Sequence, residues 1–351
     1  MSSEKKSSKK SFKSKKNTIL WTLAMAMVFI LAYISGFRSV NDLIHTVKKI
    51  GWTGVLWVFT AYTLVMLFRS IRWQLLLKQA NEKIPFYKVV LVAYIAWAQN
   101  AFIPARLGEL SRLYYLKRDH DVKIGKNSGT IILEKAFDAI GLAFLLGITA
   151  WMVSIHLPVQ KEIKIGLLFL GTASIIGIIL LALYLIYGEK LTEALKKWPK
   201  AENLHEKFHT PFKEAVTQGV IDWKIILITF ILTVLQWFTE ASTIYLVSLR
   251  LGLRTPWLAV MLASLFGYAT FILPLLPGNV GSFEGVIAVV LQGFGVPYEK
   301  GFQVPFLTHL LVVAYLAITG SISFLLIEIL NSKEKDQGNK SNISTPLLTE
   351  K

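Results

Sequence analysis

Long runs of residues without a charged side chain, separated by short polar connectors, make up most of the chain. A helix needs about 20 apolar residues to cross a hydrocarbon core of about 30 Å, so most runs predict one membrane span each, and the shorter runs 89–105 and 285–298 predict incomplete crossings. Because backbone polar groups cannot stay unpaired in lipid, each span is expected to be helical. The pattern predicts an all-α, polytopic membrane protein of about seven to nine helices. The uncharged runs cover residues 17–37, 51–68, 89–105, 139–160, 165–188, 225–239, 255–283, 285–298 and 301–327.

Composition and charge narrow the class of protein further. Hydrophobic residues make up 54% of the chain and charged residues 17%, whereas soluble domains average about 45–50% and about 25%. The net charge is 38 − 22 = +16, and on so apolar a chain it favours contact with anionic lipid, or a role in topology, over nucleic acid. The absence of cysteine excludes disulfides, thiolate metal sites and cysteine nucleophiles.

The two ends of the chain differ from the apolar middle. Residues 1–16 hold seven lysines and one glutamate among serines, which predicts a disordered basic tail before an uncleaved first span, and residues 331–351 predict a second loose tail. The membrane domain is expected to cover 17–330. Lysines near the first span place the N-terminus in the cytoplasm, and we expect a multi-pass protein of the cell membrane with both termini cytoplasmic. The lysine-rich stretch 189–224 predicts an amphipathic connector.

Two apolar segments are interrupted in a similar way. Basic residues flank the run 89–105 on both sides, which predicts that this run dips into the membrane and returns to the same face. The run 255–283 is too long for one span and contains Pro274, Pro277, Gly278 and Gly281. In each segment a proline is followed by a glycine four positions later and then by a glutamate: Pro104, Gly108 and Glu109, and Pro277, Gly281 and Glu284. Interrupted segments at corresponding positions of two halves are typical of inverted-repeat transporters. The sequence therefore predicts two re-entrant segments that enter from opposite faces.

The predicted spans contain a few charged residues. Glu134 and Asp138 are four positions apart and share a helix face, and Glu240 follows Gln236 at the same spacing. Charged groups inside a span cost about 2.5–3.5 kcal/mol or more at its centre, so they usually face the protein interior. Two interpretations stay open: a functional site, or structural ion pairs with Arg69, Arg72 or Arg106. These arginines directly follow the uncharged runs 51–68 and 89–105, so we expect them in the connectors.

The stretch from Asn100 to Arg112 is rich in polar groups beside Pro104. A helix that starts after Pro104 would direct free N–H groups and its positive dipole end into the membrane, which suits a phosphate. Arg106 and Arg112 can contact a phosphodiester through two hydrogen bonds each. On the other half, Gly278 and Gly281 allow a close approach of the backbone. The alternative is that the arginines only mark the cytoplasmic side.

Other motifs carry little chemistry. The triplet Asp119-His120-Asp121 is similar to the metal-binding motif of nucleotide-sugar transferases, but it stands in a short basic loop. His205 and His209 are four positions apart in the lysine-rich stretch, where a solvated helix face is expected rather than zinc. We expect no metal and no cofactor.

Four groups of residues together resemble the lysylphosphatidylglycerol synthase transmembrane-region family, over about residues 17–330. They are Arg72-Trp73, the polar stretch from Asn100 to Arg112, Glu134 with Asp138, and the segment from Pro274 to Glu284. The family includes the membrane half of the multiple peptide resistance factor, which flips aminoacylated phosphatidylglycerol. The resemblance implies inverted repeats with re-entrant helices and implies a lipid site at Arg106, Glu109, Arg112, Glu134, Asp138 and Glu284. The residue arguments above add Asn100, Gly278, Gly281 and Glu240.

The chain also departs from the family. His309 stands in the last long run, where relatives often carry an arginine, and 21 residues follow Leu330, so an acyltransferase-like domain is not expected. The expected function is translocation of an anionic or aminoacylated phospholipid or a lipid-linked intermediate. One alternative is a lipid-modifying transferase or its membrane subunit, and another is a small-solute transporter. A separate transferase and a second copy of the chain are candidate partners, and nucleic acid is not.

Overall fold

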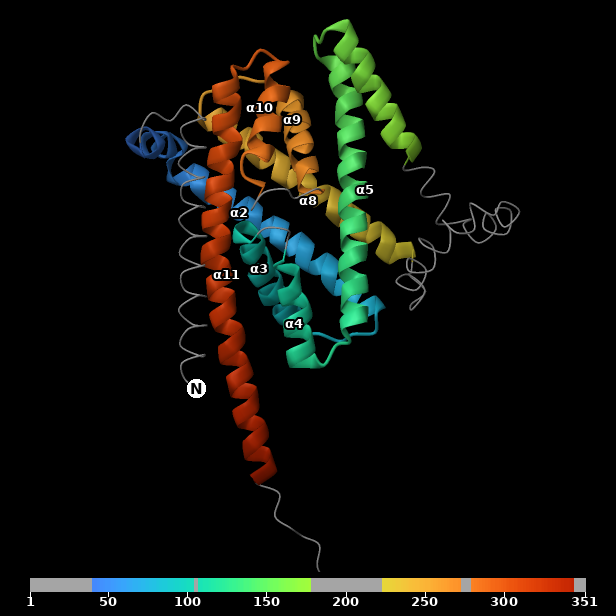
Figure 1. Cartoon of the computed structure of the whole chain (residues 1–351), viewed down its shortest axis with the longest axis vertical. Coiled ribbons are helices and arrows are strands. Elements are labelled where there is room, and N and C mark those ends of the chain that lie inside the picture. The colour runs from blue at the N-terminus through green and yellow to red at the C-terminus, as the bar shows by residue number, and fades with distance from the viewer. Residues whose placement is uncertain (1–39, 104–106, 178–222, 273–278, 344–351) are drawn as a thin grey trace, which may run out of the picture.

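The computed structural model describes residues 40–103, 107–177, 223–272 and 279–343, and this part of the chain is helical without strands (Figure 1). Four of its helices are long and apolar enough to cross a membrane: Ile44–Gln79, Ile124–His156, Lys224–Arg250 and Tyr298–Ser332. The all-α, polytopic prediction is confirmed. The elements are α2 (Val40–Gln79), α3 (Phe86–Phe102), α4 (Glu109–His120), α5 (Ile124–His156), α8 (Trp223–Arg250), α9 (Trp257–Ala269), the short 3-10 turn η2 (Thr270–Ile272), α10 (Ser282–Gln292) and α11 (Tyr298–Ile343), with a further helical segment at 161–177.

The described chain consists of two halves with the same order of elements. Each half has a long helix, two shorter helices separated by a break, and a second long helix: α2 to α5, and α8 to α11. Corresponding pairs also pack in the same way, since α2 lies against α8, and α3 lies against α11 as α9 lies against α5. In Figure 1, α3 and α4 form a hairpin at the lower end of the molecule, and α9 and α10 form one at the upper end. The predicted inverted repeat with two re-entrant segments is confirmed.

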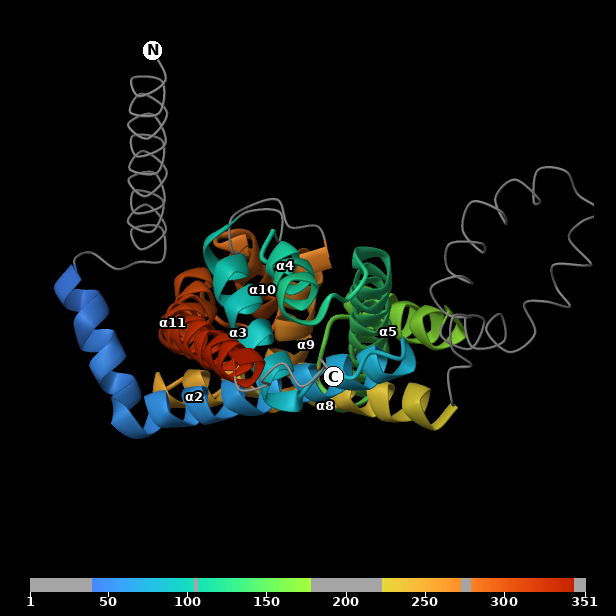
Figure 2. The ribbon, with the colours of Figure 1, turned by 90° about the horizontal axis from the view of Figure 1, so that it is seen from below.

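Figure 2 shows how the two halves are layered. Helices α2 and α8 run in opposite directions along one side of the molecule, and the two hairpins with α5 and α11 lie above them. Many large apolar side chains are exposed on the outer faces of the helices, including Trp57, Ile132, Phe169, Val289 and Leu325, whereas charged side chains such as Arg72 and Glu134 are buried. This distribution suits a molecule whose outer surface contacts lipid, because polar groups must then find partners inside.

A glycine starts the second helix of each hairpin. The Gly108 N–H donates to Asn100 Oδ1 (2.8 Å), and a Cβ atom at Gly108 would lie 2.2 Å from the Ala96 carbonyl oxygen, which leaves no room for a side chain. Gly281 has φ 93°, a conformation that glycine adopts at little cost, and its N–H donates to Glu284 Oε2 (2.6 Å). Both helices thus begin directly after corresponding glycines of the repeated motif, and the first begins at Glu109 and not just after Pro104 as expected. Pro104, Arg106, Pro274, Pro277 and Gly278 lie outside the described residues.

Two boundaries differ from those predicted. Helix α2 continues to Gln79, so Arg69 and Arg72 belong to a membrane helix and not to a connector, because buried carboxylates balance their charge. Helix α11 continues to Ile343, so residues 331–343 are helical where a loose tail was expected. The basic tail 1–16, the run 17–37, most of the stretch 189–224 with His205 and His209, and residues 344–351 lie outside the described residues.

Candidate functional site: a charged cavity between the two hairpins

A cavity of about 480 Å³ lies between the two hairpins, and all eight of the α-helices named above contribute to its wall or adjoin it. Part of the wall is apolar, with Val65, Met66, Leu142, Val312 and Leu316. The rest carries polar groups from both halves: Tyr62, Arg69, Trp97, Asn100, Glu109, Lys135, Asp138, Glu240, Tyr268, Asn279, Thr308 and His309. The cavity therefore has both an apolar and a charged surface.

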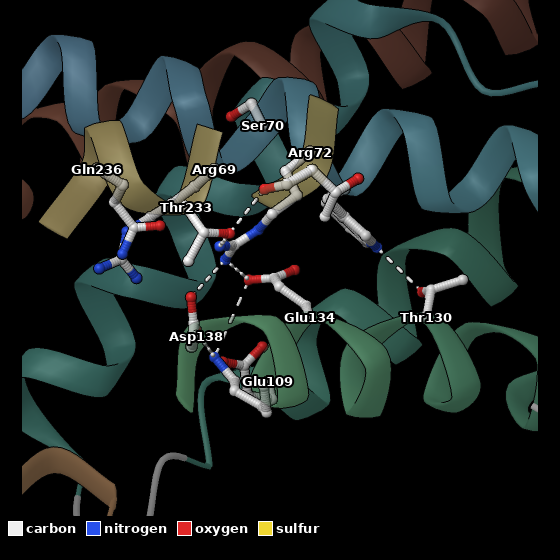
Figure 3. A network of polar contacts seen from close by, with 12 residues as sticks. Arg69, Ser70, Arg72, Glu109, Thr130, Glu134, Asp138, Thr233 and Gln236 are labelled. Carbon is white, nitrogen blue, oxygen red and sulfur yellow. Dashed lines mark hydrogen bonds and ion pairs between the residues drawn. The ribbon is translucent and has the colours of Figure 1, made fainter. Parts of the chain in front are cut away.

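Six charged side chains from α2, α4 and α5 form a closed ring of ion pairs beside the cavity. Figure 3 shows Glu134 and Asp138 directed toward Arg72, with Glu109 nearby. Positive and negative groups alternate around the ring, which we call the ion-pair ring: three cations balance three anions. Its contacts are Lys135–Glu109 (3.0 Å), Glu109–Arg112 (2.9 Å), Arg112–Glu134 (2.6 Å), Glu134–Arg72 (3.3 Å), Arg72–Asp138 (2.7 Å) and Asp138–Lys135 (3.8 Å).

Neutral side chains fix the ring in place. Arg72 Nη1 donates to Thr233 Oγ1 (2.7 Å), and the Trp237 indole N–H donates to the Asp138 carbonyl oxygen (3.0 Å), which ties α8 to the ring. The Arg112 guanidinium lies over Trp73, with Cζ 3.8 Å from the ring centroid. Buried charges of this kind are stable only when all of them are paired. The ring therefore holds the first hairpin to α2, α5 and α8.

Arg69 faces the cavity and keeps part of its hydrogen-bonding capacity. Its Nη2 donates to Glu240 Oε1 (2.5 Å), and its guanidinium stacks on Trp97, with Cζ 3.6 Å from the ring centroid. Among the residues that the structure describes, Nε and Nη1 of Arg69 are buried without a hydrogen-bond partner. Lys135 lies near the same indole, with Nζ 5.3 Å from its centroid. Arg69 therefore keeps two donor nitrogens that the described residues leave without an acceptor.

The second hairpin presents a different pair. Glu284 is fully buried, and its Oε1 lies 2.7 Å from His309 Nδ1, while its Oε2 accepts the Gly281 N–H. The aromatic rings of Phe271 and Phe283 lie beside the imidazole. His309 lines the cavity and Glu284 lies behind it. This half thus contributes one buried carboxylate whose described side-chain partner is a histidine.

Comparison with known proteins agrees with this architecture. The family model of the lysylphosphatidylglycerol synthase transmembrane region matches residues 19–320. The chain belongs to this family. It is similar to a UPF0104 membrane protein of Methanocaldococcus jannaschii, with 27% identity over 229 residues, which cover 65% of this chain and 94% of the relative. A UPF0104 membrane protein of Pyrococcus horikoshii is 22% identical over 337 residues, which cover 88% of this chain and 97% of the relative.

In this member of the lysylphosphatidylglycerol synthase transmembrane-region family, the cavity brings together only some of the site residues predicted from the sequence. Asn100, Glu109, Asp138 and Glu240 line it. Arg112 and Glu134 lie in the ion-pair ring, where Arg112 is 2% exposed and contacts two carboxylates, and Glu284 and Gly281 lie behind His309. Arg106 and Gly278 lie outside the described residues. The predicted ion pairs of the acids with Arg69 and Arg72 are confirmed.

The predictions from the sequence missed several cavity residues or gave them another role. Arg69 was assigned to a connector, although its spacing of three from Arg72 places both on one helix face. Lys135 was noted beside Glu134 but not proposed as a site residue. Trp97, a further member of the wall, lies in an apolar run in which its position gives no signal of a cation partner.

The acids of the triplet Asp119-His120-Asp121 serve contacts on the outside of the first hairpin. Asp119 accepts hydrogen bonds from Arg118 and from Asn331 Nδ2 (2.9 Å), and the exposed Asp121 pairs with Lys117. Partial burial disfavours the charged form of Asp119, but these hydrogen bonds outweigh it and hold its pKa below the usual value. Within the described ranges, no group of three or more His, Asp or Glu side chains is arranged to hold a metal ion.

Proposed function

We propose that this protein moves an amphiphile with a phosphodiester head group across the membrane, such as an anionic or aminoacylated phospholipid or a lipid-linked intermediate. The cavity suits such a molecule, because its polar wall can accommodate a head group while the apolar wall contacts the first carbons of the chains. Hairpins that enter from opposite ends are typical of transporters in which the site lies near the middle of the membrane.

The observation that carries the proposal is the pair of unpartnered nitrogens on Arg69. The ion-pair ring is neutral and its arginines are engaged with carboxylates, so it offers little attraction for an anion. Arg69 lines the cavity, has one carboxylate partner and keeps two nitrogens without a hydrogen-bond partner among the described residues. Arginine can bind a phosphate through two parallel hydrogen bonds, and the Trp97 face holds its plane in one orientation.

The orientation of the molecule forms part of this proposal. If the lysine-rich N-terminal segment is cytoplasmic and the uncharged run 17–37 crosses the membrane, as the sequence predicts, the hairpin of α3 and α4 opens toward the cytoplasm. The hairpin of α9 and α10 then opens toward the outside, and the C-terminus is cytoplasmic. A head group would therefore enter beside one hairpin and leave beside the other.

A lipid-translocation assay tests the proposal. The full chain is reconstituted in vesicles with a short-chain fluorescent phosphatidylglycerol, and the accessibility of the label to an external quencher is followed. The double variant Arg69→Gln/Glu240→Gln keeps the cavity charge balanced and is expected to lower the translocation rate about tenfold or more, as expected for loss of a charge-assisted contact. Lys117→Gln, which changes an exposed cation of the first hairpin, is the control. A folded double variant with the wild-type rate would contradict the role of Arg69.

A further inference from the structure

The Glu284–His309 pair differs from the other buried ion pairs of this site. Glu109, Glu134, Asp138 and Glu240 each contact an arginine or a lysine, which keep their charge at neutral pH. The described partner of the Glu284 carboxylate is instead a histidine, a type of residue that exists in proteins in both a charged and a neutral form. At the Glu284–His309 pair the protein can therefore gain or lose a proton, and the ion pairs between carboxylates and arginine or lysine stay intact.

The charges around the cavity can be added directly. The permanent cations are Arg69, Arg72, Arg112 and Lys135, and the carboxylates are Glu109, Glu134, Asp138, Glu240 and Glu284. Among the described residues of the cavity and the ring the sum is 4 − 5 = −1, and one proton held by the Glu284–His309 pair brings the sum over these residues to zero. Tyr62 and Tyr268 also line the cavity, and a tyrosine is ordinarily uncharged at neutral pH.

A phosphodiester adds one negative charge to the described charges of this largely buried site. An unbalanced charge in such surroundings is costly, so binding of the anion favours uptake of a proton by a nearby group that can accept one. The Glu284–His309 pair can hold a second proton, as an imidazolium beside a carboxylic acid. In that state His309 Nδ1–H still donates to Oε1, and Oε2 still accepts the Gly281 N–H through a lone pair.

We propose that the Glu284–His309 pair is a proton-binding site, and that it takes up one proton from water when a phosphodiester head group binds at Arg69. Anion and proton then occupy the cavity together, so a pH gradient across the membrane can bias the direction of lipid movement. This inference rests on the proposed function, since it names the ion that accompanies the head group.

The groups that face the pair come from every element around the cavity. Phe271 and Phe283 contact the imidazole directly and exclude water from that side. Asn279 and Thr308 are neutral neighbours in the wall. The charged groups across the cavity are Arg69 on α2, Glu109 on α4, Lys135 and Asp138 on α5, and Glu240 on α8. Each of these groups has a partner of permanent opposite charge, whereas the described partner of Glu284 is a histidine.

Calorimetry on the full chain in detergent tests the inference. Dihexanoyl-phosphatidylglycerol is titrated into the protein at about pH 7.5 in two buffers that differ in ionisation enthalpy, which gives the number of protons taken up per bound lipid. We expect about one proton for the wild type, with Kd rising about tenfold per pH unit above neutral pH. The double variant Glu284→Gln/His309→Gln is expected to bind the lipid without proton uptake. Both positions change together because either single variant keeps one group that can accept the proton.

The outcomes separate this inference from the proposed function. Lipid binding by the wild type without proton uptake would overturn the proton site and leave the phosphodiester site standing. Unchanged proton uptake in the folded double variant would assign the proton to another group and would also overturn the proton site. Proton uptake by the variant Glu240→Gln would then show whether that other group is Glu240. Absence of lipid binding in the wild type would remove the phosphodiester site itself, and the proton site with it. His156→Gln, a change of an exposed histidine at the end of α5, is the control and should behave as the wild type.

A transport measurement gives a second test that does not depend on the variants. Wild-type vesicles with fluorescent phosphatidylglycerol are studied with and without an imposed difference of about one pH unit. The proposed coupling predicts faster translocation from the acidic side and slower translocation against the gradient, by several-fold. Equal rates in both directions, in vesicles that do translocate the lipid, would overturn the coupling.

Discussion

The two hairpins share a backbone plan but differ in their chemistry. Both consist of two short helices with a glycine immediately before the second helix, and both pack against a long helix of the opposite half. The first hairpin contributes Glu109 and Arg112 to a ring of six charges. The second contributes one carboxylate, Glu284, whose described partner is His309. An inverted repeat therefore fixes the position of the hairpins and leaves their side chains free to differ.

This difference assigns different physical properties to the two halves. Separating the first hairpin from α2 and α5 would leave several permanent charges unpaired in a buried site, which is costly at every pH. The second hairpin is held by the hydrogen bond from the Gly281 N–H to Glu284 and by the contact between Glu284 and His309. We expect the first hairpin to be the more rigid of the two. The predictions below test that contrast.

The largest effect is expected from Glu134→Gln. Glu134 lies between Arg112 (2.6 Å) and Arg72 (3.3 Å), and its side chain is 1% exposed. The substitution leaves the ion-pair ring with an unbalanced buried cation, so the free energy of unfolding should fall by about 3–5 kcal/mol. Chemical denaturation in detergent, followed by circular dichroism or tryptophan fluorescence, measures the change.

The matched variant in the second hairpin is Glu284→Gln. It keeps an oxygen that can accept the Gly281 N–H, and the neutral form of His309 remains compatible with it. The loss of stability should therefore be clearly smaller than for Glu134→Gln. Equal losses in the two variants would contradict the contrast between the hairpins.

A second comparison concerns the glycines that start the second helices. In Gly108→Ala the new Cβ would meet the Ala96 carbonyl oxygen and Asn100 Oδ1, so the backbone of the hairpin must shift. Gly281→Ala instead imposes a residue with a side chain on φ 93°, which costs about 1–3 kcal/mol. We expect both variants to lower the melting temperature, and Gly108→Ala to lower it more. Gly252→Ala, in the connector after α8 and also at positive φ, is the control for the conformational effect alone.

Most of the fold could be predicted from the sequence, because the signals are local. Uncharged runs indicate helices, and the prolines and glycines near 104–108 and 274–281 indicate breaks. The repeated proline, glycine and glutamate pattern related the two halves. The ends of the helices were less predictable, since a run defined by the absence of charge ends at Arg69, whereas α2 continues to Gln79.

The candidate site could be predicted only in part, because it depends on partners far apart in the chain. Arg69 pairs with Glu240 over 171 positions, and spacing cannot reveal such a contact. For the same reason Arg112 was expected to bind phosphate, whereas the structure gives it Glu109 and Glu134 as partners. The acids Asp138 and Glu240 were found from the sequence because a charge in an apolar run is conspicuous wherever its partner lies.

The smallest effect is expected at the outer end of the first hairpin. There Arg118 pairs with Glu328 of α11 (2.8 Å), and Asp119 accepts a hydrogen bond from Asn331. Asp119→Asn should cost less than about 1 kcal/mol, since these ion pairs are partly exposed. The depressed pKa of Asp119 means that its contribution is present above the ordinary aspartate pKa, about 3.9, and disappears as the pH falls through the lower value in the folded protein. The melting temperatures of wild type and variant should therefore differ at pH 6 and converge in acid.

Asp121→Asn, the control, changes an exposed carboxylate of the same triplet and should show no measurable difference from the wild type at either pH. A larger loss for Asp119→Asn than for Glu134→Gln would mean that the first hairpin is held mainly at its outer end and not by the ion-pair ring.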